Sequence, residues 1–435
     1  MICMQGKRIL IFSKFRYDRR LTCCQKPACG SESIPVSKIR GRIEAIDVGS
    51  TAIAIGVPKM TPSLESSLIQ HFAGLEDPRI ERTKQHLLLD MIVIAILAVI
   101  SGADGWVAIE TYGQSKQEWL STFLSLPNGI PSHDTFARVF ARINPQAFEQ
   151  CFRDWISSIT GTMGAQVIPI DGKTLRGSYD REAKQGALCV VSAWASEHRL
   201  VLGQVKVNSK SNEITVIPQL LKMLNISGSI ISIDAMGCQR EIASLIRQQG
   251  GDYVLALKAN QGSLYTQVEQ FFKQVQQTEF CGIEHSHHHT TESGHGRIEI
   301  RHYYSVPVSA LAGVSGQDKW ADLTSIGMVI CERRLWNKTT IEVRYYISSL
   351  PAGAQVLAHA VRTHWGIENS VHWTLDVTFR EDASRIRTGS SPQNFALLRR
   401  IALNQLQRET SVRGSMRMKR YRAALDNHYA AKEDG

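Results

Sequence analysis

The chain has 435 residues, of which 43% are hydrophobic and 21% charged, a composition ordinary for a globular protein with a sizeable core. Its longest apolar stretch, residues 87–100, contains Asp90 and is too short to span a bilayer, so we expect no membrane protein. The nine cysteines follow no pairing pattern, which argues against a disulfide framework and favours the cytoplasm.

The net charge of +10 is concentrated at the two ends of the chain. Residues 1–60 carry 11 Lys and Arg against 4 Asp and Glu, and residues 380–435 carry 12 against 6. Such ends suit a polyanion such as nucleic acid, although basic termini also serve as solubilising tails. We interpret residues 1–60 as a disordered extension or an over-extended reading frame, with Met60 as an alternative start, and residues 411–435 as a basic tail.

Residues 61–160 show helical periodicity. Ser132 has the place of an N-cap before a helix whose Phe136, Val139 and Phe140 form an apolar stripe. A turn followed by a short helix that bears Arg138 and Arg142 is compatible with a helix-turn-helix DNA reader, so DNA recognition is one hypothesis. Plain helical packing is its rival, and the acidic balance of this region argues against strong phosphate binding.

Strand patterns follow in residues 161–410. We expect three antiparallel strands, then a helix, a strand, a second helix and a fifth strand, at residues 167–171, 187–195, 200–207, 214–224, 229–234, 239–248 and 252–258. A β-rich stretch over about residues 270–350 interrupts this rhythm and is interpreted as an insertion, in which the tract His287–His289 is predicted to be a polar loop. A long helix with Glu368 and a second helix opened by Ser391 and Pro392 follow.

Two of the predicted strands end on an aspartate, Asp171 and Asp234, and the late helix carries Glu368. Three clustered carboxylates repel one another unless cations neutralise them, and Mg²⁺ prefers a few carboxylates together with water and phosphate oxygens. Two such ions can clamp the oxygens of an in-line phosphoryl transfer. A set of nearby cations would then contact a phosphodiester backbone: Lys173, Arg176 and Lys258.

Three blocks, residues 170–178, 233–239 and 364–369, resemble the three motifs of bacterial DDE insertion-sequence transposases, and the most similar group is that of the H-repeat-associated proteins. The resemblance covers roughly residue 61 to the end. It implies an α/β fold with an RNase H-like core, a mixed five-stranded sheet with helices carrying a β-rich insertion, preceded by a helical N-terminal domain. It also implies a catalytic and metal-binding triad of Asp171, Asp234 and Glu368.

The resemblance further implies Mg²⁺ as the cofactor, with Mn²⁺ as a substitute, and double-stranded DNA as the partner, in the form of terminal inverted repeats and target DNA. A homodimer or higher assembly on DNA, and association with the bacterial nucleoid, are expected with it. Related transposases place a tyrosine, an arginine and a lysine around the glutamate where this chain has Val361, His364 and Leu375. We therefore expect His364 or Arg380 to take over phosphate contacts.

Several alternatives remain open from the sequence. Asp376 and Glu381 are rival acids for the third catalytic position. The chain can also be a metal-dependent nuclease on the same fold, or an inactive transposase relic that only binds DNA.

Overall fold

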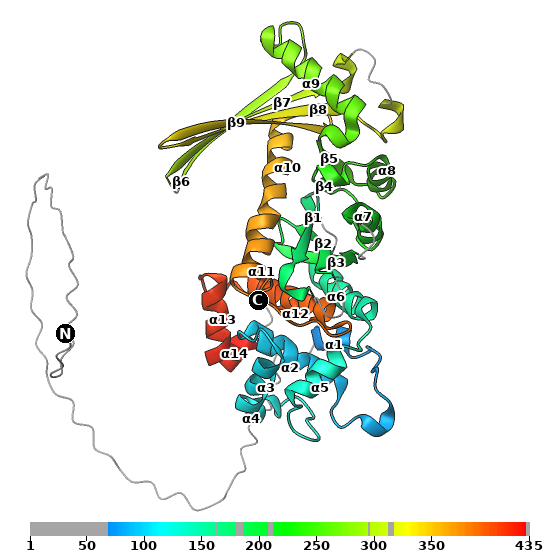
Figure 1. The fold of residues 1–435 in the computed structure, drawn as a ribbon, viewed down its shortest axis with the longest axis vertical. Helices are drawn as coiled ribbons and strands as arrows, with labels where there is room; N and C mark the ends of the chain where they lie inside the picture. The colour runs from blue at the N-terminus through cyan, green and yellow to red at the C-terminus, as the bar shows by residue number, and fades with distance from the viewer. Residues whose placement is uncertain are drawn as a thin grey trace, which may run out of the picture. The chain divides into compact units, whose positions relative to one another are not determined.

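The computed structural model describes residues 68–161, 164–179, 186–207, 212–294, 296–311 and 317–431. The predictions for residues 1–60 lie outside the described residues. The described part is a mixed α/β structure built on one large sheet (Figure 1).

Within the described residues the sheet has nine strands in the order β3-β2-β1-β4-β5-β9-β8-β7-β6. Their bounds are Val167–Leu175 (β1), Leu188–Ala195 (β2), Leu200–Val207 (β3), Ile230–Ile233 (β4), Asp252–Leu257 (β5), Ser286–Gly294 (β6), Arg297–Pro307 (β7), Ser325–Leu335 (β8) and Lys338–Ser348 (β9). Strands β1, β4 and β5 run parallel to one another, and every other neighbouring pair is antiparallel.

The β-rich stretch differs from the prediction in two ways. It continues the main sheet, because β9 pairs with β5 through Val254 and Ser348. The tract His287–His289 is a strand rather than a loop and lies in the edge strand β6. An edge strand has one free side, so β6 tolerates polar residues and lacks the apolar alternation that marks a buried strand.

Strand β1 also differs from the prediction, which ended it at Asp171. The strand continues to Leu175, because residues Ile170–Leu175 pair with β2. Only its first part, Val167–Ile170, has the parallel partner β4. Asp171 therefore lies where one neighbouring strand stops while the other continues.

Short helices precede the sheet: α1 Leu68–Phe72, α2 Leu88–Ile100, α3 Trp106–Ser115, α4 Gln117–Leu120, α5 His133–Phe140 and α6 Pro145–Thr160. Local chemistry starts the last of these, since Asn144 accepts hydrogen bonds from the backbone N–H groups of Gln146 and Ala147, with proline at the first helical position. In α5 the predicted stripe of Phe136, Val139 and Phe140 is buried.

Three helices follow β3, β4 and β5: α7 Glu213–Lys222, α8 Arg240–Gln248 and α9 Gly262–Gln277. After the last strand come α10 Ala354–Ile367, a π-helical turn Glu368–His372, α11 Trp373–Val377, α12 Ser391–Arg408, α13 Met416–Leu425 and α14 Asn427–Ala430. None of the helices in the described ranges is long and apolar enough to cross a membrane.

Helices from both halves of the chain share one core. Helix α2 is buried almost throughout and packs against α12. The ring of Trp106 meets the edge of Phe395 at 4.9 Å. The expected basic tail contributes to this core as well, because Arg420 of α13 is buried, donates to the carbonyl of Val99 and stacks over Phe379 at 4.2 Å. This packing joins the N-terminal helices to the C-terminal helices α12 and α13.

Candidate active site

The register of two parallel strands brings Asp171 and Asp234 together. Ile170 of β1 is the partner of Ile233 of β4, and each aspartate is the next residue along its chain. The two aspartates therefore occupy adjacent positions, where β4 ends and β1 continues along β2. The sequence analysis predicts that the two aspartates share a site, and the parallel pairing of β1 and β4 accounts for their proximity.

The side chain of Asp234 is held in place by the turn that follows it. Its Oδ1 accepts hydrogen bonds from the backbone N–H groups of Met236 at 3.1 Å and Gly237 at 3.4 Å. Asp234 thus caps the short helical turn Ala235–Gly237. The orientation of the carboxylate is set by the backbone, so it is not free to rotate toward a side-chain partner.

Glu368 lies on the π-helical turn that interrupts the predicted regular helix. Helix α10 packs against β1, β4 and β5 and brings the turn to the strand ends. The N–H of Trp373 donates to the carbonyl of Glu368, five residues earlier, which is the π pattern. Such turns insert one extra residue into a helix and frequently occur at functional sites.

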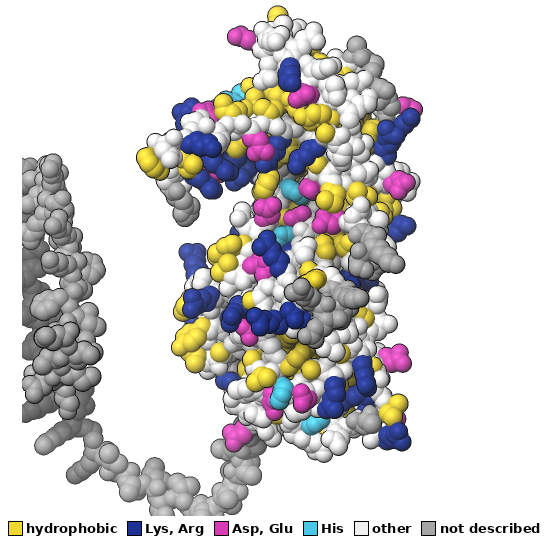
Figure 2. Space-filling model, in the orientation of Figure 1, with side chains coloured by type: hydrophobic (Ala, Val, Ile, Leu, Met, Phe, Trp, Pro, Cys, Tyr) yellow, Lys and Arg dark blue, Asp and Glu magenta, His cyan; other side chains and the backbone are white. Residues whose placement is uncertain are grey.

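The three predicted acids line one cavity of about 170 Å³, together with Lys258, His364 and Arg344. We call this site the acid cavity. Lys258 follows β5 and is exposed, so its ammonium is available at the mouth of the cavity. Figure 2 shows acidic and histidine side chains gathered at the inner end of a hollow in the surface below the projecting strands.

Negative charge in the acid cavity is only partly compensated. Burial raises the pKa of Asp171 to about 7, although a hydrogen bond from the Gly172 N–H opposes it, and the nearby Asp234, Glu213 and Glu368 raise it further. Burial, followed by Asp234, also raises the pKa of Glu213. A carboxyl group with such neighbours resists ionisation unless a cation is added.

The chemistry of these donors fits a hard divalent cation, since carboxylate oxygens are the ligands that such ions prefer. Among the described residues, however, no three His, Cys, Asp or Glu side chains lie close enough to one another to hold a metal ion. The acids share a cavity and an excess of negative charge, but they do not form a closed coordination sphere in this conformation.

Two histidines border the acids without adding positive charge. Nδ1 of His364 lies 3.2 Å from Oγ of Ser232 on β4, and burial lowers the pKa of His364. Nδ1 of His372 lies 3.5 Å from Oδ2 of Asp171. Burial, with Arg400 and Lys173 as further causes, lowers the pKa of His372 to about 4, so its imidazole is neutral at pH 7.

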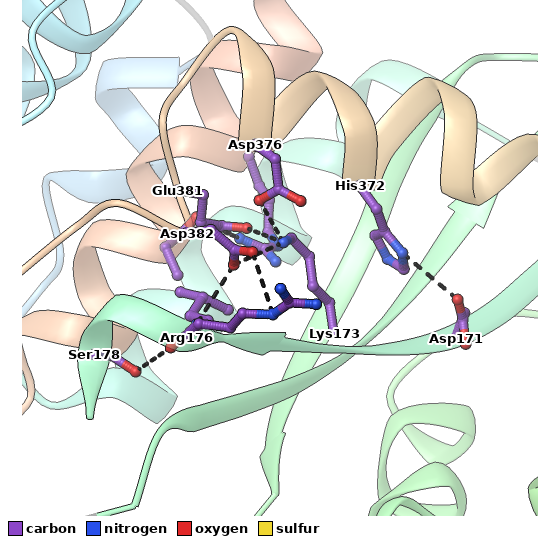
Figure 3. A network of polar contacts seen from close by, with 11 residues as sticks. Asp171, Lys173, Arg176, Ser178, His372, Asp376, Glu381 and Asp382 are labelled. Carbon is purple, nitrogen blue, oxygen red and sulfur yellow. Dashed lines mark hydrogen bonds and ion pairs between the residues drawn. The ribbon is translucent and has the colours of Figure 1, made fainter.

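Lys173 is buried in a neighbouring group of charges rather than facing the acid cavity (Figure 3). Its Nζ lies 2.5 Å from Asp376, 3.3 Å from Asp382 and 4.0 Å from Glu381. Glu381 is fully buried and also pairs with Arg400 at 2.8 Å. We call this group the lysine cluster. The predicted role of Lys173 is a phosphate contact. In this structure its ammonium instead neutralises carboxylates of the protein itself.

The remaining predicted DNA contacts lie in different places. Arg176 is exposed, with its Nε 3.8 Å from Asp382 at the edge of the lysine cluster (Figure 3). Arg380 pairs with Asp104 at 3.3 Å, beside the N-terminal helices. Of the residues expected to replace the family's phosphate contacts, His364 lines the acid cavity and Arg380 does not. The rival acids Asp376 and Glu381 are both engaged in the lysine cluster.

Two residues near the acids were not predicted. Glu213 lies at the start of α7, and its carboxylate packs so close to Gly172 that a side chain at this position would have to displace it. Arg344 lies on β9 and reaches the acid cavity. Neither residue belongs to a recognisable motif. The one sequence feature that could have indicated Arg344 is the alternation of residues 341–346, which places Arg344 and Tyr346 on the same face of the strand.

Comparison with known proteins gives matches over most of the chain. The family model described as "Transposase DDE domain" matches residues 162–405, and "DDE_Tnp_1-associated" matches residues 69–156. Two Escherichia coli (strain K12) proteins named H repeat-associated putative transposases are similar: YhhI is 41% identical over 84% of this chain and 96% of its own length, and YbfD is 44% identical over 54% and 91%.

A third relative, the "Inactive transposase YbfQ" of the same strain, is 40% identical over 17% of this chain and 89% of its own length. Enzymes with DDE transposase domains generally use divalent metal ions, which suits the carboxylates of the acid cavity. The family model covers more than half of the sequence, and YhhI aligns along nearly all of its length. The chain therefore belongs to the DDE transposase family, in the H repeat-associated group of insertion-sequence transposases.

Proposed function

We propose that the chain cleaves DNA at the ends of its own insertion sequence and transfers the freed strand to target DNA, with Asp171, Asp234 and Glu368 as the catalytic acids. One observation carries this proposal: these acids come from the three family blocks and line a single cavity with an exposed lysine at its mouth. One site can catalyse both cleavage and strand transfer, because both steps are in-line displacements at phosphorus.

Each residue has a distinct task in this proposal. Asp171, Asp234 and Glu368 would hold two Mg²⁺ ions, which Mn²⁺ can replace, and these ions would offset the charge that develops on the attacking and leaving oxygens. The capped side chain of Asp234 offers a carboxylate whose orientation is already fixed. His372 faces Asp171 as a neutral imidazole and so orients that carboxylate without adding positive charge to it.

DNA contacts complete the proposal. The exposed Lys258 would meet the phosphate next to the scissile bond, and the exposed Arg176 would meet one farther away. Terminal inverted repeats would be read outside the acid cavity, where α5 and the loop after it expose Arg138 and Arg142. Joining two ends of one element to one target requires at least two copies of the site, so we propose a dimer or higher assembly on DNA.

A strand-transfer assay tests the function. The donor is linear DNA carrying both ends of the element that encodes the chain, the target is a supercoiled plasmid, and Mg²⁺ or Mn²⁺ is added. Asp171→Asn, Asp234→Asn and Glu368→Gln should each reduce joined product to background. Asp376→Asn is the matched control, because Asp376 is an acid of the lysine cluster, and it should retain strand transfer.

Other outcomes would assign the chain differently. Metal-dependent cleavage without joined product would indicate a nuclease on this fold. Footprints over the terminal repeats without any cleavage would indicate a relic that only binds DNA. Retention of strand transfer by all three cavity variants would overturn the site assignment, and its loss in Asp376→Asn alone would move the site to the rival acid.

A further inference from the structure

A second cavity of about 170 Å³ lies between strands β7–β9 and helix α10. Arginines dominate its charged lining, and we call it the arginine groove. Its arginines are Arg297, Arg301, Arg333, Arg344 and Arg362. Figure 2 shows Lys and Arg side chains collected along the side of the projecting strands that faces the hollow. The family match and the proposed function leave this surface without a role.

The pleat of the strands places these side chains on one face. Arg301 on β7 is opposite Cys331 on β8, which in turn is opposite Glu342 on β9. Residues two apart share a face, so Arg333 and Arg344 follow on that side. Helix α10 supplies Arg362 from the opposite wall of the groove.

Carboxylates hold the arginines in position but do not neutralise them. The buried Glu299 is shared by Arg297 at 3.2 Å, Arg333 at 2.9 Å and Arg301. Glu292 is likewise shared by Arg301 and Arg362, each at 3.1 Å.

Arg344 pairs with Glu342 at 2.7 Å. These ion pairs set five guanidinium groups against three carboxylates, which leaves a surplus of positive charge. Because neighbouring carboxylates already order the guanidinium groups, little side-chain entropy remains to be lost on binding an anion.

The arginine groove is continuous with the acid cavity. Four residues line both: Arg344, Tyr346, Val361 and Trp365. The guanidinium of Arg344 lies over the ring of Trp365, 4.5 Å from its centre, so it is held at the junction. A phosphodiester in the acid cavity would therefore have its flanking phosphates beside these guanidinium groups.

We propose that the arginine groove binds the phosphodiester backbone of the DNA strand that leads into the acid cavity, with Arg344 contacting the phosphate nearest the reacting one. This inference rests on the proposed function, because it takes the acid cavity as the place of reaction. The planar guanidinium group matches phosphate oxygens in two-point contacts. An acidic polypeptide would also pair with arginine, but nothing would place it in line with the acids.

Two adjacent residues of β8 provide the test. Arg333 faces the groove and Arg334 faces the opposite side, yet their side chains are 50% and 52% exposed and each Nε pairs with one glutamate, Glu299 or Glu332. Full-length Arg333→Gln and Arg334→Gln proteins are titrated onto a labelled 30-base-pair duplex and a labelled 30-nucleotide single strand over a range of salt concentrations. Thermal unfolding confirms that both variants are folded.

Loss of one phosphate contact should make the plot of log affinity against log salt shallower by about 0.9 on duplex or about 0.7 on single strand in Arg333→Gln, and should leave Arg334→Gln unchanged. The probe with the larger change shows which form of DNA occupies the groove. Arg344→Gln should change the slope in the same way.

Equal changes in Arg333→Gln and Arg334→Gln, or no change in either, would overturn the groove assignment. The assignment would also be overturned if Arg333→Gln kept its affinity for DNA but lost binding to poly-glutamate, because the groove would then bind an acidic polypeptide. The proposed function fails separately, through strand transfer that persists in the Asp234→Asn protein.

Discussion

The acid cavity and the lysine cluster are neighbouring groups of carboxylates that differ in whether the protein supplies cations to neutralise them. Strand β1 supplies both, with Asp171 in the first and Lys173, two residues on, in the second. In the lysine cluster every carboxylate has a cation within 4.0 Å. In the acid cavity the charged groups that shift the pKa of Asp171 are carboxylates, and the imidazole beside it is neutral. Buried acids with internal counter-ions build structure, whereas acids without them are left for a ligand.

The pKa shifts follow the same division. Burial would raise the pKa of Glu381, but Arg400, Arg399 and Lys173 outweigh it and the pKa lies below its usual value. Burial and neighbouring acids raise the pKa of Asp171 to about 7. Glu381 is the more deeply buried of the two, yet its pKa is the one that is lowered, so counter-charge rather than burial decides which site is stable without an added cation.

The largest expected effect separates activity from stability in the acid cavity. Asp234→Asn should abolish strand transfer while leaving the free energy of unfolding at pH 8 unchanged or higher, because asparagine keeps the cap to Met236 and removes repulsion from Asp171. Urea unfolding followed by tryptophan fluorescence measures the stability. A clear loss of stability would show that the carboxylates of this cavity are structural after all.

The opposite result is expected in the lysine cluster. Glu381→Gln should lower the free energy of unfolding by about 3–5 kcal/mol, because it leaves the fully buried Arg400 without its carboxylate. The double variant Glu381→Leu with Arg400→Leu removes both charges and should recover much of this loss. Urea unfolding of both proteins gives the comparison. A loss below about 1 kcal/mol would remove the distinction drawn between the two sites.

The sequence reveals the parts of this comparison that depend on local pattern. Two apolar strands that end on an aspartate, together with the resemblance to the three family blocks, predict that Asp171 and Asp234 share a site, and the parallel pairing of β1 and β4 shows how they come together. Helical periodicity predicts the helix that carries Glu368. The order and approximate bounds of β2–β5, α7 and α8 also follow from runs of apolar residues and from turn residues.

Tertiary packing determines the parts that the sequence does not reveal. The spacing of Lys173 from Asp171 favours a phosphate contact, and only the return of residues 376–382 to β1 makes it an internal counter-ion. The π-turn at Glu368 leaves no mark in the apolar pattern. Arg344 is distant from every motif, and it reaches the acid cavity because β9 pairs with β5.

A third buried acid, Glu149, differs from both Asp171 and Glu381, because a bound proton neutralises it. Glu149 of α6 is buried, and its Oε1 accepts a hydrogen bond of 2.8 Å from the N–H of Gln204 on β3. Burial raises its pKa from 4.5 to about 8. The folded protein therefore binds a proton that the unfolded chain releases above pH 4.5, so this group's stabilisation is lost as pH rises between about 4.5 and 8.

Glu149→Gln should remove this pH dependence. In the unaltered protein, Glu149 should lower the free energy of unfolding by about 1.4 kcal/mol for each unit of pH increase within that window. The difference in free energy of unfolding between the two proteins should therefore change by about 1.4 kcal/mol from pH 6 to pH 7. Urea titrations at both pH values measure it, with Glu118→Gln as the control at an exposed position. Parallel pH profiles for Glu149→Gln and the unaltered protein would mean that Glu149 is ionised, and that the nearby Arg153 neutralises it as Arg400 neutralises Glu381.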